Sequence, residues 1–306
     1  MRKTAVFLLL AAALCSAQAP ANAHSENARR IAGTRWLPAY NFFCVAPRAN
    51  AADDPPIAPT KIFDNLYAIG DSGTTAYALT TRDGIILIDS LPANQTETVL
   101  LPGMKALGLD PAAVKLIIVT HGHGDHSGGS FYFQERFGAK VALTSQDWDM
   151  LRPADGKGKA QNNAPRRDVI AVEGQPLTLG EVSVTPVLTP GHTPGSLGLI
   201  FPVKEGTTTH VAGLFGGTLL LPMRPDVPTI QTYLASIAHF KEVALRMKVD
   251  VEIQNHPLMD GIAARLTALR DRKPGAPHPF VAGAENYGAF LDVMSECLRA
   301  QRSDLP

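Results

Sequence analysis

Apolar residues in this chain fall into short runs separated by turn-forming residues, and this pattern predicts β-strands. The runs cover residues 65–70, 74–81, 84–90, 114–120, 140–145, 179–189, 196–203, 209–217 and 249–256. The first three are bounded by Gly, Asp or Asn, and the run at 114–120 is short, continuous and β-branched.

Helical periodicity is confined to a few places. One stretch repeats apolar residues at the spacing of a single helix face, which predicts a helix packed on the core. Its core-facing positions are Ile230, Tyr233, Leu234, Ile237 and Phe240. A second amphipathic stretch, residues 279–297, is expected to form a closing helix with Tyr287, Phe290 and Leu291 packed inward. Asp110 followed by Pro111 has the pattern of a helix N-cap and first helical residue.

The strand-rich runs form two halves, each with helices. Residues 61–306 are therefore expected to form one α/β domain in which two sheets face each other under outer helices. Residues 24–60, rich in Ala and Pro, are expected to be an extended lead-in. Residues 152–168 break the periodicity and form either a plain surface loop or a flap near a site.

The first residues differ from the rest of the chain. Residues 1–23 have the pattern of a secretory signal peptide: two basic residues, an apolar run over residues 5–14, and Ala-Asn-Ala at the end. Cleavage before His24 would export the protein to the periplasm or the medium. No stretch is long and apolar enough to predict a stable membrane insertion of the mature chain.

Charge and cysteine content narrow the partners. The net charge is zero, with 28 basic and 28 acidic residues and no basic block, so we expect a small-molecule substrate rather than nucleic acid. Cys44 and Cys297 would remain after cleavage, either as a disulfide or as two buried thiols. Neither lies near a histidine, which disfavours zinc binding by cysteine. The oligomeric state is left open.

Potential metal ligands are concentrated in THGHGDHSGG, residues 120–129, directly after a predicted strand. His121 and His123 are two residues apart, so both side chains can point the same way. Asp125 and His126 follow on the next turn. Imidazole and carboxylate groups suit zinc, but four ligands in six residues are too many for one tetrahedral ion. The motif therefore predicts parts of two sites.

Two histidines elsewhere are candidates to complete these sites. His192 in TPGHTPGS and His256 in QNHP each follow a predicted strand, where a loop can present a side chain to a shared cleft. The remaining histidines lack this context and are expected to be isolated surface residues; they are His24, His210, His239 and His278. His239, in the predicted helix, is expected at the surface or in a packing contact.

The motifs HGHGDH, TPGHTPGS and NHP, in this order, resemble the metallo-β-lactamase superfamily over about residues 61 to 256. The resemblance implies an αββα sandwich with two facing mixed sheets, and two zinc ions per chain. Asp89 corresponds to the aspartate that supports the metal loop. Use of Asp125 and His126 together is similar to subclass B3. The first zinc would be bound by His121, His123 and His192, and the second by Asp125, His126 and His256.

This resemblance implies a mechanism. Two zinc ions about 3.5–4 Å apart would share a hydroxide that attacks a carbonyl carbon, while zinc stabilises the oxyanion or the leaving nitrogen. Asp125 would be the catalytic residue, because it both binds metal and orients the nucleophile. The expected function is an exported dizinc hydrolase that opens a β-lactam ring and so confers antibiotic resistance.

The segment LFGGTLLL departs from several members of the family. Lactonases, glyoxalase II and persulfide dioxygenases have an aspartate, and B1 enzymes a cysteine, where this chain has Thr218 or, in an alternative alignment, Gly217; neither residue supplies a ligand. Thr218, closer to the serine of B3 enzymes, is expected beside the ligands. Leucines occupy the next positions, which leaves Arg224 or the 152–168 loop to contact a substrate carboxylate. The alternatives are a hydrolase of another amide or ester, such as a lactone, and an iron-dependent oxidoreductase of the persulfide dioxygenase kind.

Overall fold

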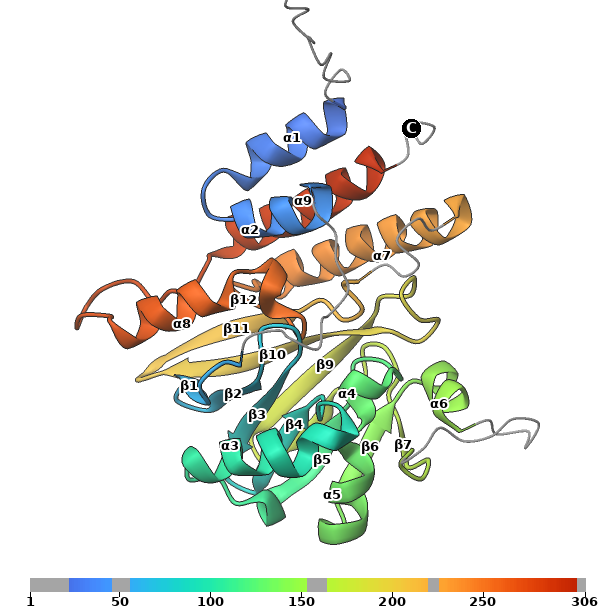
Figure 1. Ribbon diagram of the computed structural model, residues 1–306, viewed down its shortest axis with the longest axis vertical. Coiled ribbons are helices and arrows are strands. Elements are labelled where there is room, and N and C mark those ends of the chain that lie inside the picture. The colour runs from blue at the N-terminus through green and yellow to red at the C-terminus, as the bar shows by residue number, and fades with distance from the viewer. Residues whose placement is uncertain (1–21, 46–55, 153–163, 220–225, 302–306) are drawn as a thin grey trace, which may run out of the picture.

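The computed structural model describes residues 22–45, 56–152, 164–219 and 226–301 of the 306-residue chain. Two sheets lie face to face between outer helices (Figure 1), which confirms the αββα sandwich expected from the sequence. Both sheets mix parallel and antiparallel pairs.

Seven strands form the first sheet within the described residues, and they lie side by side in chain order. The pairs from β1 to β4 are antiparallel, and those from β4 to β7 are parallel. The strands are β1 Thr60–Phe63, β2 Leu66–Gly70, β3 Thr75–Thr81, β4 Gly84–Ile88, β5 Val114–Ile118, β6 Lys140–Leu143 and β7 Val169–Ile170.

The second sheet, over the same part of the chain, has five strands in the order β12-β11-β10-β9-β8. Only the β11–β12 pair is parallel among these. The strands are β8 Leu177–Leu179, β9 Val182–Leu188, β10 Leu197–Glu205, β11 Thr208–Leu214 and β12 Val251–Ile253.

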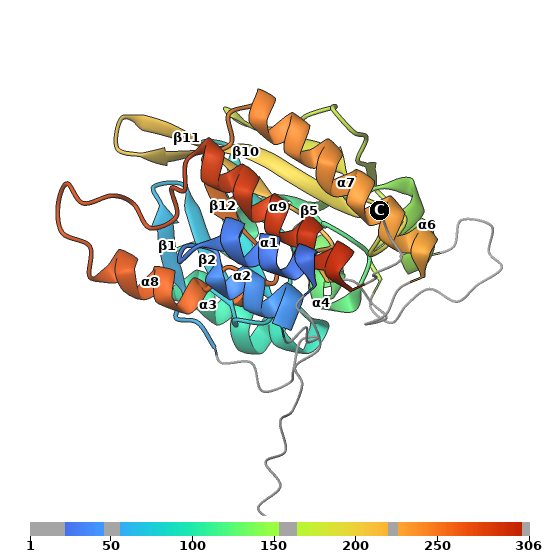
Figure 2. The ribbon, with the colours of Figure 1, turned by 90° about the horizontal axis from the view of Figure 1, so that it is seen from above.

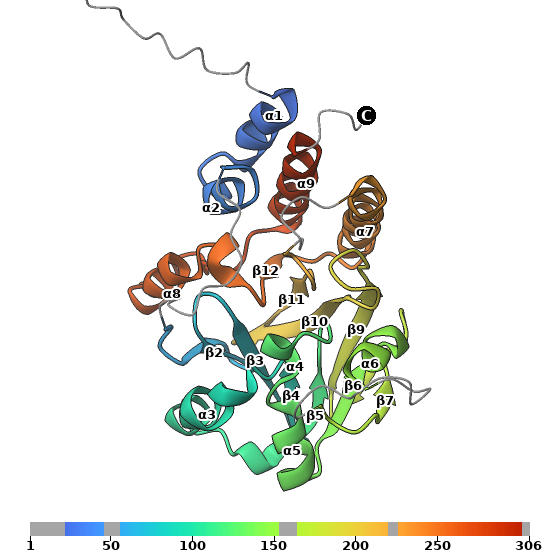
Figure 3. The same cartoon turned by 45° about the vertical axis from the view of Figure 1, so that its right-hand side comes forward.

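Helices cover both outer faces, as Figure 3 shows: α7 and α9 lie over the second sheet, and α3, α5 and α6 over the first. The α-helices are α1 Ala23–Ala32, α2 Leu37–Tyr40, α3 Leu101–Ala106, α4 Gly124–Ser127, α5 Ser130–Phe137, α6 Ser145–Leu151, α7 Val227–Arg246, α8 Ile262–Arg270 and α9 Ala284–Ala300. Short 3-10 and π turns are η1 Asn41–Val45, η2 Ala93–Gln95, η3 Thr96–Leu100, η4 Pro111–Ala113 and η5 Pro257–Met259.

The apolar core is divided by the two sheets into three layers. In β4, Ile86 and Ile88 face the other sheet, while Ile85 and Leu87 face the helices. Because both faces of the strand are covered, its sequence is a continuous apolar run rather than an alternating one. A third cluster lies between the second sheet and α7, α9 and the N-terminal helices.

The strand and helix predictions agree with the structure. Each predicted strand coincides with one of β2–β6 or β9–β12. The stripe on α7 is buried, with Leu234 only partly so, and the three expected residues of α9 are buried as well. Asp110 accepts a hydrogen bond from the Ala112 N–H at 2.9 Å and so caps η4, a single 3-10 turn rather than a full helix.

The prediction of an extended lead-in over residues 24–60 is wrong for its first half. Helices α1 and α2 and the turn η1 fill residues 23–45 and pack against α9 and its neighbours (Figure 2). Ala28, Ala32 and Trp36 are buried there, and the Trp36 indole N–H donates to the Asn286 carbonyl at 2.7 Å. The Ala- and Pro-rich stretch that suggested an extended chain begins only at residue 49, after these helices.

The structure decides between the two interpretations of the cysteines. Cys44 of η1 and Cys297 of α9 form a disulfide, with Cα atoms 4.8 Å apart and a sequence separation of 253. The N-terminal helices are thereby tied covalently to the closing helix.

Two of the histidines expected to be isolated at the surface are not: His210 is half-buried and His278 is buried. The His210 ring contacts Asp250 at 2.6 Å, and the buried His278 ring stacks on Phe63 with centroids 4.2 Å apart. Both pack at structural positions that single-residue context does not reveal. His239 is exposed, as expected. Among the described residues no helix has the length and apolar character needed to cross a membrane.

Candidate metal centre

The candidate metal ligands come from loops that follow strands of both sheets. His121 and His123 come shortly after β5 of the first sheet, and Asp125 and His126 lie on the short helix α4 that follows. His192 follows β9 and His256 follows β12, both of the second sheet. The structure thus brings together all six side chains singled out in the sequence.

One ion could be held by His121, His123 and His192, which we call the first set. Nε2 of His192 lies 2.9 Å from Nε2 of His121 and 2.9 Å from Nδ1 of His123. The rings of His121 and His123 are both nearly perpendicular to that of His192. Ligands of a tetrahedral zinc ion lie about 3.3 Å apart, so three nitrogens facing one another at this distance fit one ion.

The second set consists of Asp125, His126 and His256. Nε2 of His126 lies 3.0 Å from Nε2 of His256 and 3.4 Å from Oδ2 of Asp125. Oδ2 of Asp125 is 3.9 Å from Nε2 of His256. His121 also lies within reach of Asp125 and His126, so the two sets are adjacent.

The far ring nitrogens of the second set have fixed acceptors. Nδ1 of His126 lies 2.8 Å from Oδ2 of Asp89, and Nδ1 of His256 lies 2.7 Å from the carbonyl oxygen of Gly73. An acceptor at Nδ1 places the ring proton there and leaves the Nε2 lone pair facing its partners. Imidazoles held in this tautomer are suited to bind a metal ion.

Burial and charge favour the ligand form of most of these histidines. Burial lowers the pKa of His192 to about 3 and that of His256 to about 4, and neighbouring imidazoles contribute. Burial acts to lower the pKa of His126 as well, but Asp125 and Asp89 outweigh it and raise the pKa to about 10. The second set therefore has enough negative charge to hold a cation, and a divalent ion would take the place of that proton.

Asp89 organises the loop that carries the ligands. It is fully buried, with a φ of 56°, and accepts hydrogen bonds from the Thr120 N–H at 2.7 Å and the Thr120 hydroxyl at 3.0 Å. Asn255, next to His256, donates its amide N–H to Oδ2 of Asp89 at 3.1 Å. Because a left-handed φ is strained for Asp, these contacts must hold the residue in place. Asp89 lies where the sequence analysis expected it, behind the ligands.

Asp147 supports the first set and was missed in the sequence. From α6 it accepts the Gly122 N–H at 2.8 Å, the Gly195 N–H at 2.9 Å and the Thr193 hydroxyl at 2.8 Å. One buried carboxylate therefore joins the loop of His121 and His123 to the loop of His192. The signal for it was the pattern Thr144-x-x-Asp147, which indicates a helix start; the Thr144 side chain does cap α6.

Thr218 is buried close to the first set. A Cβ added to the preceding residue, Gly217, would lie 2.9 Å from Cβ of His192, which places this turn against the ligand loop. The Thr218 hydroxyl has no hydrogen-bond partner among the residues that the structure describes. Arg224, the expected substrate contact, and most of the 152–168 loop lie outside the described residues.

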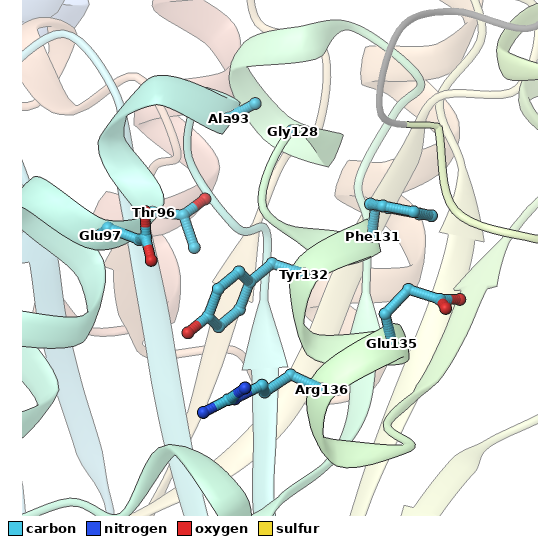
Figure 4. Close-up of a pocket in the computed structure, with 8 residues that line it drawn as sticks. All are labelled: Ala93, Thr96, Glu97, Gly128, Phe131, Tyr132, Glu135 and Arg136. Atoms are coloured by element: carbon cyan, nitrogen blue, oxygen red, sulfur yellow. The ribbon is translucent and has the colours of Figure 1, made fainter.

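A separate cavity of about 350 Å³ lies between η3 and α5, and Gly128, just after α4, also lines it. In Figure 4 the side chains of Tyr132 and Arg136 extend from α5 to the side of the cavity on which Glu97 lies. Its lining contains none of the six candidate ligands. This cavity is therefore distinct from the candidate metal centre.

Comparison with known proteins agrees with the fold and the ligand motifs. The family model described as the metallo-β-lactamase superfamily matches residues 69–206. BJP-1, a subclass B3 metallo-β-lactamase of Bradyrhizobium japonicum, is 29% identical, with a TM-score of 0.64, and the match covers 77% of this chain and 90% of that one. Rm3 metallo-β-lactamase is 27% identical, with a TM-score of 0.64 and coverage of 77% and 91%.

Sequence relatives carry other names. A probable metallo-hydrolase of Burkholderia pseudomallei is 30% identical over 171 residues, which are 51% of this chain and 54% of that protein. A hydroxyacylglutathione hydrolase of Chelativorans sp. is 26% identical over 66% of this chain and 77% of its own length. The match thus spans about half the length of the first of these relatives. Fold, motif order and family model agree that the chain is similar to the metallo-β-lactamase superfamily, and its structure is similar to those of subclass B3 enzymes.

Proposed function

We propose that this protein is an exported zinc-dependent hydrolase that opens a β-lactam ring, with two zinc ions per chain. The observation that carries the proposal is the pair of adjacent ligand sets, built from three histidines and from Asp125 with two histidines. Structural likeness to a subclass B3 enzyme supports the choice of a cyclic amide as substrate.

Different residues of the chain would have different roles in the reaction. The two sets would hold the ions, which when bound lower the pKa of water and polarise a carbonyl group. Asp125, the partly exposed member of the second set, faces His126 and would orient the attacking water. Asp89 and Asp147 would hold the ligand loops in position through hydrogen bonds with His126 and Gly122.

The test is hydrolysis of a chromogenic cephalosporin by the purified mature protein. We expect about two bound zinc ions by metal analysis, turnover that a chelator abolishes, and recovery when zinc is restored. His192→Ala should lose activity, whereas His239→Ala, a change at an exposed histidine on α7, should not. Two bound zinc ions without turnover of any β-lactam would contradict the proposed substrate, and bound iron would contradict the proposed metal.

A second candidate is hydrolysis of another acyl compound, such as a lactone or a thioester. It is favoured by the sequence relatives named hydroxyacylglutathione hydrolase. Thr218 counts against this second candidate, because lactonases and glyoxalase II have an aspartate at this position. A panel of lactones and thioesters, assayed with the same zinc-loaded protein, separates the two candidates.

Export is part of the proposal. The Cys44–Cys297 disulfide supports it, because such bonds persist in oxidising compartments. Fractionation of expressing cells should recover the protein outside the cytoplasm with His24 as its first residue. Recovery of a chain that starts at Met1 in the cytoplasm would overturn this part.

A further inference from the structure

Two buried carboxylates and one arginine lie on either side of His256 in the sequence. Glu252 of β12 and Asp260, after η5, both have fully buried side chains. Nη1 of Arg265, on α8, donates to Oε2 of Glu252 and to Oδ2 of Asp260, each at 2.7 Å. The guanidinium also binds the Glu252 carbonyl and lies 4.2 Å from the Phe280 ring centroid. These contacts join the two ends of the segment that presents His256.

If both carboxyl groups are ionised, Glu252, Asp260 and Arg265 together carry a net charge of minus one. Two carboxylates face one guanidinium, and an unpaired buried anion is strongly unfavourable. Within the described residues, Oε1 of Glu252 and Oδ1 of Asp260 have no hydrogen-bond donor. One proton placed between the carboxyl groups would satisfy both orphaned oxygens and leave a single negative charge for Arg265.

Among the described residues, the groups packed around Glu252 and Asp260 offer no cation at close range other than Arg265. Tyr77 of β3 and Tyr287 of α9 face the two carboxylates, and burial raises the pKa of both phenols well above the ordinary value, so they stay neutral. Arg35, between α1 and α2, lines an outer cavity that also reaches Asp260 and Arg265, but its side chain is exposed. Within the part of the chain described, Arg265, with a side chain 12% exposed, is the arginine that pairs with both carboxylates.

We propose that Glu252 and Asp260 share one proton, so that with Arg265 they form a neutral clamp that positions His256. The proton is held by one carboxyl group and accepted by the other, while the remaining charge pairs with the guanidinium. Burial raises the pKa of Asp260 well above its ordinary value and Glu252 raises it further, against the lowering effect of Arg265. Glu252, Asp260 and Arg265 are thus positioning residues, and their role at His256 rests on the proposed metal centre.

Asp260→Asn is the informative variant, because an amide N–H can replace the shared proton without being lost at high pH. The pKa of Asp260 is higher in the folded state than in the unfolded state, where it is about 3.9. The shared proton therefore stabilises the fold fully below the unfolded pKa, and this stabilisation is lost as pH rises through the folded pKa. The unfolding constant of the wild type should therefore grow about tenfold per pH unit relative to Asp260→Asn across that window. Parallel curves would overturn the shared proton.

Infrared spectroscopy of the metal-free protein tests the same point without the metal. At neutral pH the wild type should show the carbonyl stretch of a protonated carboxylic acid that Asp260→Asn lacks. Glu242→Gln, a change at an exposed acid of α7, is the matched control and should keep the band. An identical spectrum for wild type and Asp260→Asn would exclude the proposal, whatever the enzyme's substrate.

Zinc titration tests the link to His256. Asp260→Ala should weaken binding of one zinc equivalent at least about tenfold and spare the other, and Asp260→Asn should restore it. Equal binding by wild type and Asp260→Ala would show that the clamp does not position His256. Failure of the wild type to bind zinc would instead contradict the proposed function and leave the infrared result standing.

Discussion

At the scale of single residues, the candidate centre depends on two buried aspartates outside the ligand sets. Asp89 contacts the loop and His126 of the second set, and Asp147 joins the two loops of the first set. Each accepts backbone N–H groups from a segment that bears ligands. Hydrogen bonds of this kind fix the geometry of ligands that touch the metal directly.

Replacing Asp147 by Asn should weaken the first set selectively. The amide cannot accept from the Gly122 and Gly195 N–H groups and the Thr193 hydroxyl together, so the two loops lose their common anchor. We expect zinc affinity of one equivalent to fall about 10–100-fold, measured by competition with a chromophoric chelator. Asp149→Asn, two residues along and exposed, is the control; equal losses in both variants would refute the anchor.

Gly195, in the loop that follows His192, contacts the same carboxylate of Asp147. A Cβ at this position would lie 2.0 Å from the Thr144 hydroxyl oxygen and 2.6 Å from Oδ1 of Asp147. Gly195→Ala should therefore push α6 away from the His192 loop and lower the free energy of unfolding by about 1–3 kcal/mol, measured in denaturant. Gly138→Asn is a suitable control, because its left-handed φ tolerates Asn and its surroundings are open. An unchanged midpoint in Gly195→Ala would contradict this packing.

At the scale of elements, the N-terminal helices support the second set indirectly. Helix α2 and turn η1 contact η5, which directly follows His256, and the disulfide ties η1 to α9. A covalent link across most of the chain restricts the unfolded state strongly.

The Cys44→Ala/Cys297→Ala double variant should lose about 2–4 kcal/mol of unfolding free energy. Denaturant unfolding, compared with that of the wild type under oxidising and reducing conditions, measures the loss. Reduction should destabilise the wild type and leave the double variant unchanged. A double variant as stable as the oxidised wild type would show that the disulfide does not hold these helices.

At the scale of the whole molecule, the candidate centre joins the two sheets. The first set takes His121 and His123 from the loop after β5 and His192 from the loop after β9, so one bound ion would link both halves of the sandwich. Ligands that bind only the folded state stabilise it in proportion to the logarithm of their concentration.

Zinc removal should therefore lower the melting temperature of the entire domain. At zinc concentrations about 100 times the dissociation constant, the stabilisation is about 2.7 kcal/mol for one site, and calorimetry with and without chelator would detect it. His192→Ala should show a smaller shift than the wild type. A chelator-independent melting curve would argue against an ion that bridges the sheets.

The sequence by itself determined most of the strands, the main helices and the candidate metal ligands, because these depend on local patterns. Apolar runs bounded by turn residues fixed β2–β6 and β9–β12, and histidines placed just after strands marked the site. The family resemblance added the αββα sandwich and the division of the candidate ligands into two sets. These patterns can be recognised in the sequence because each involves residues that are close together along the chain.

Only the tertiary structure decided the roles that arise between distant segments. Asp147 has an ordinary helix-start pattern in sequence, and its three contacts reach residues 25 to 48 positions away. The pairing of Cys44 with Cys297, the helices of the lead-in and the cluster of Glu252, Asp260 and Arg265 likewise depend on packing against remote elements. Burial and charge compensation are properties of three-dimensional neighbours, so a sequence pattern cannot display them.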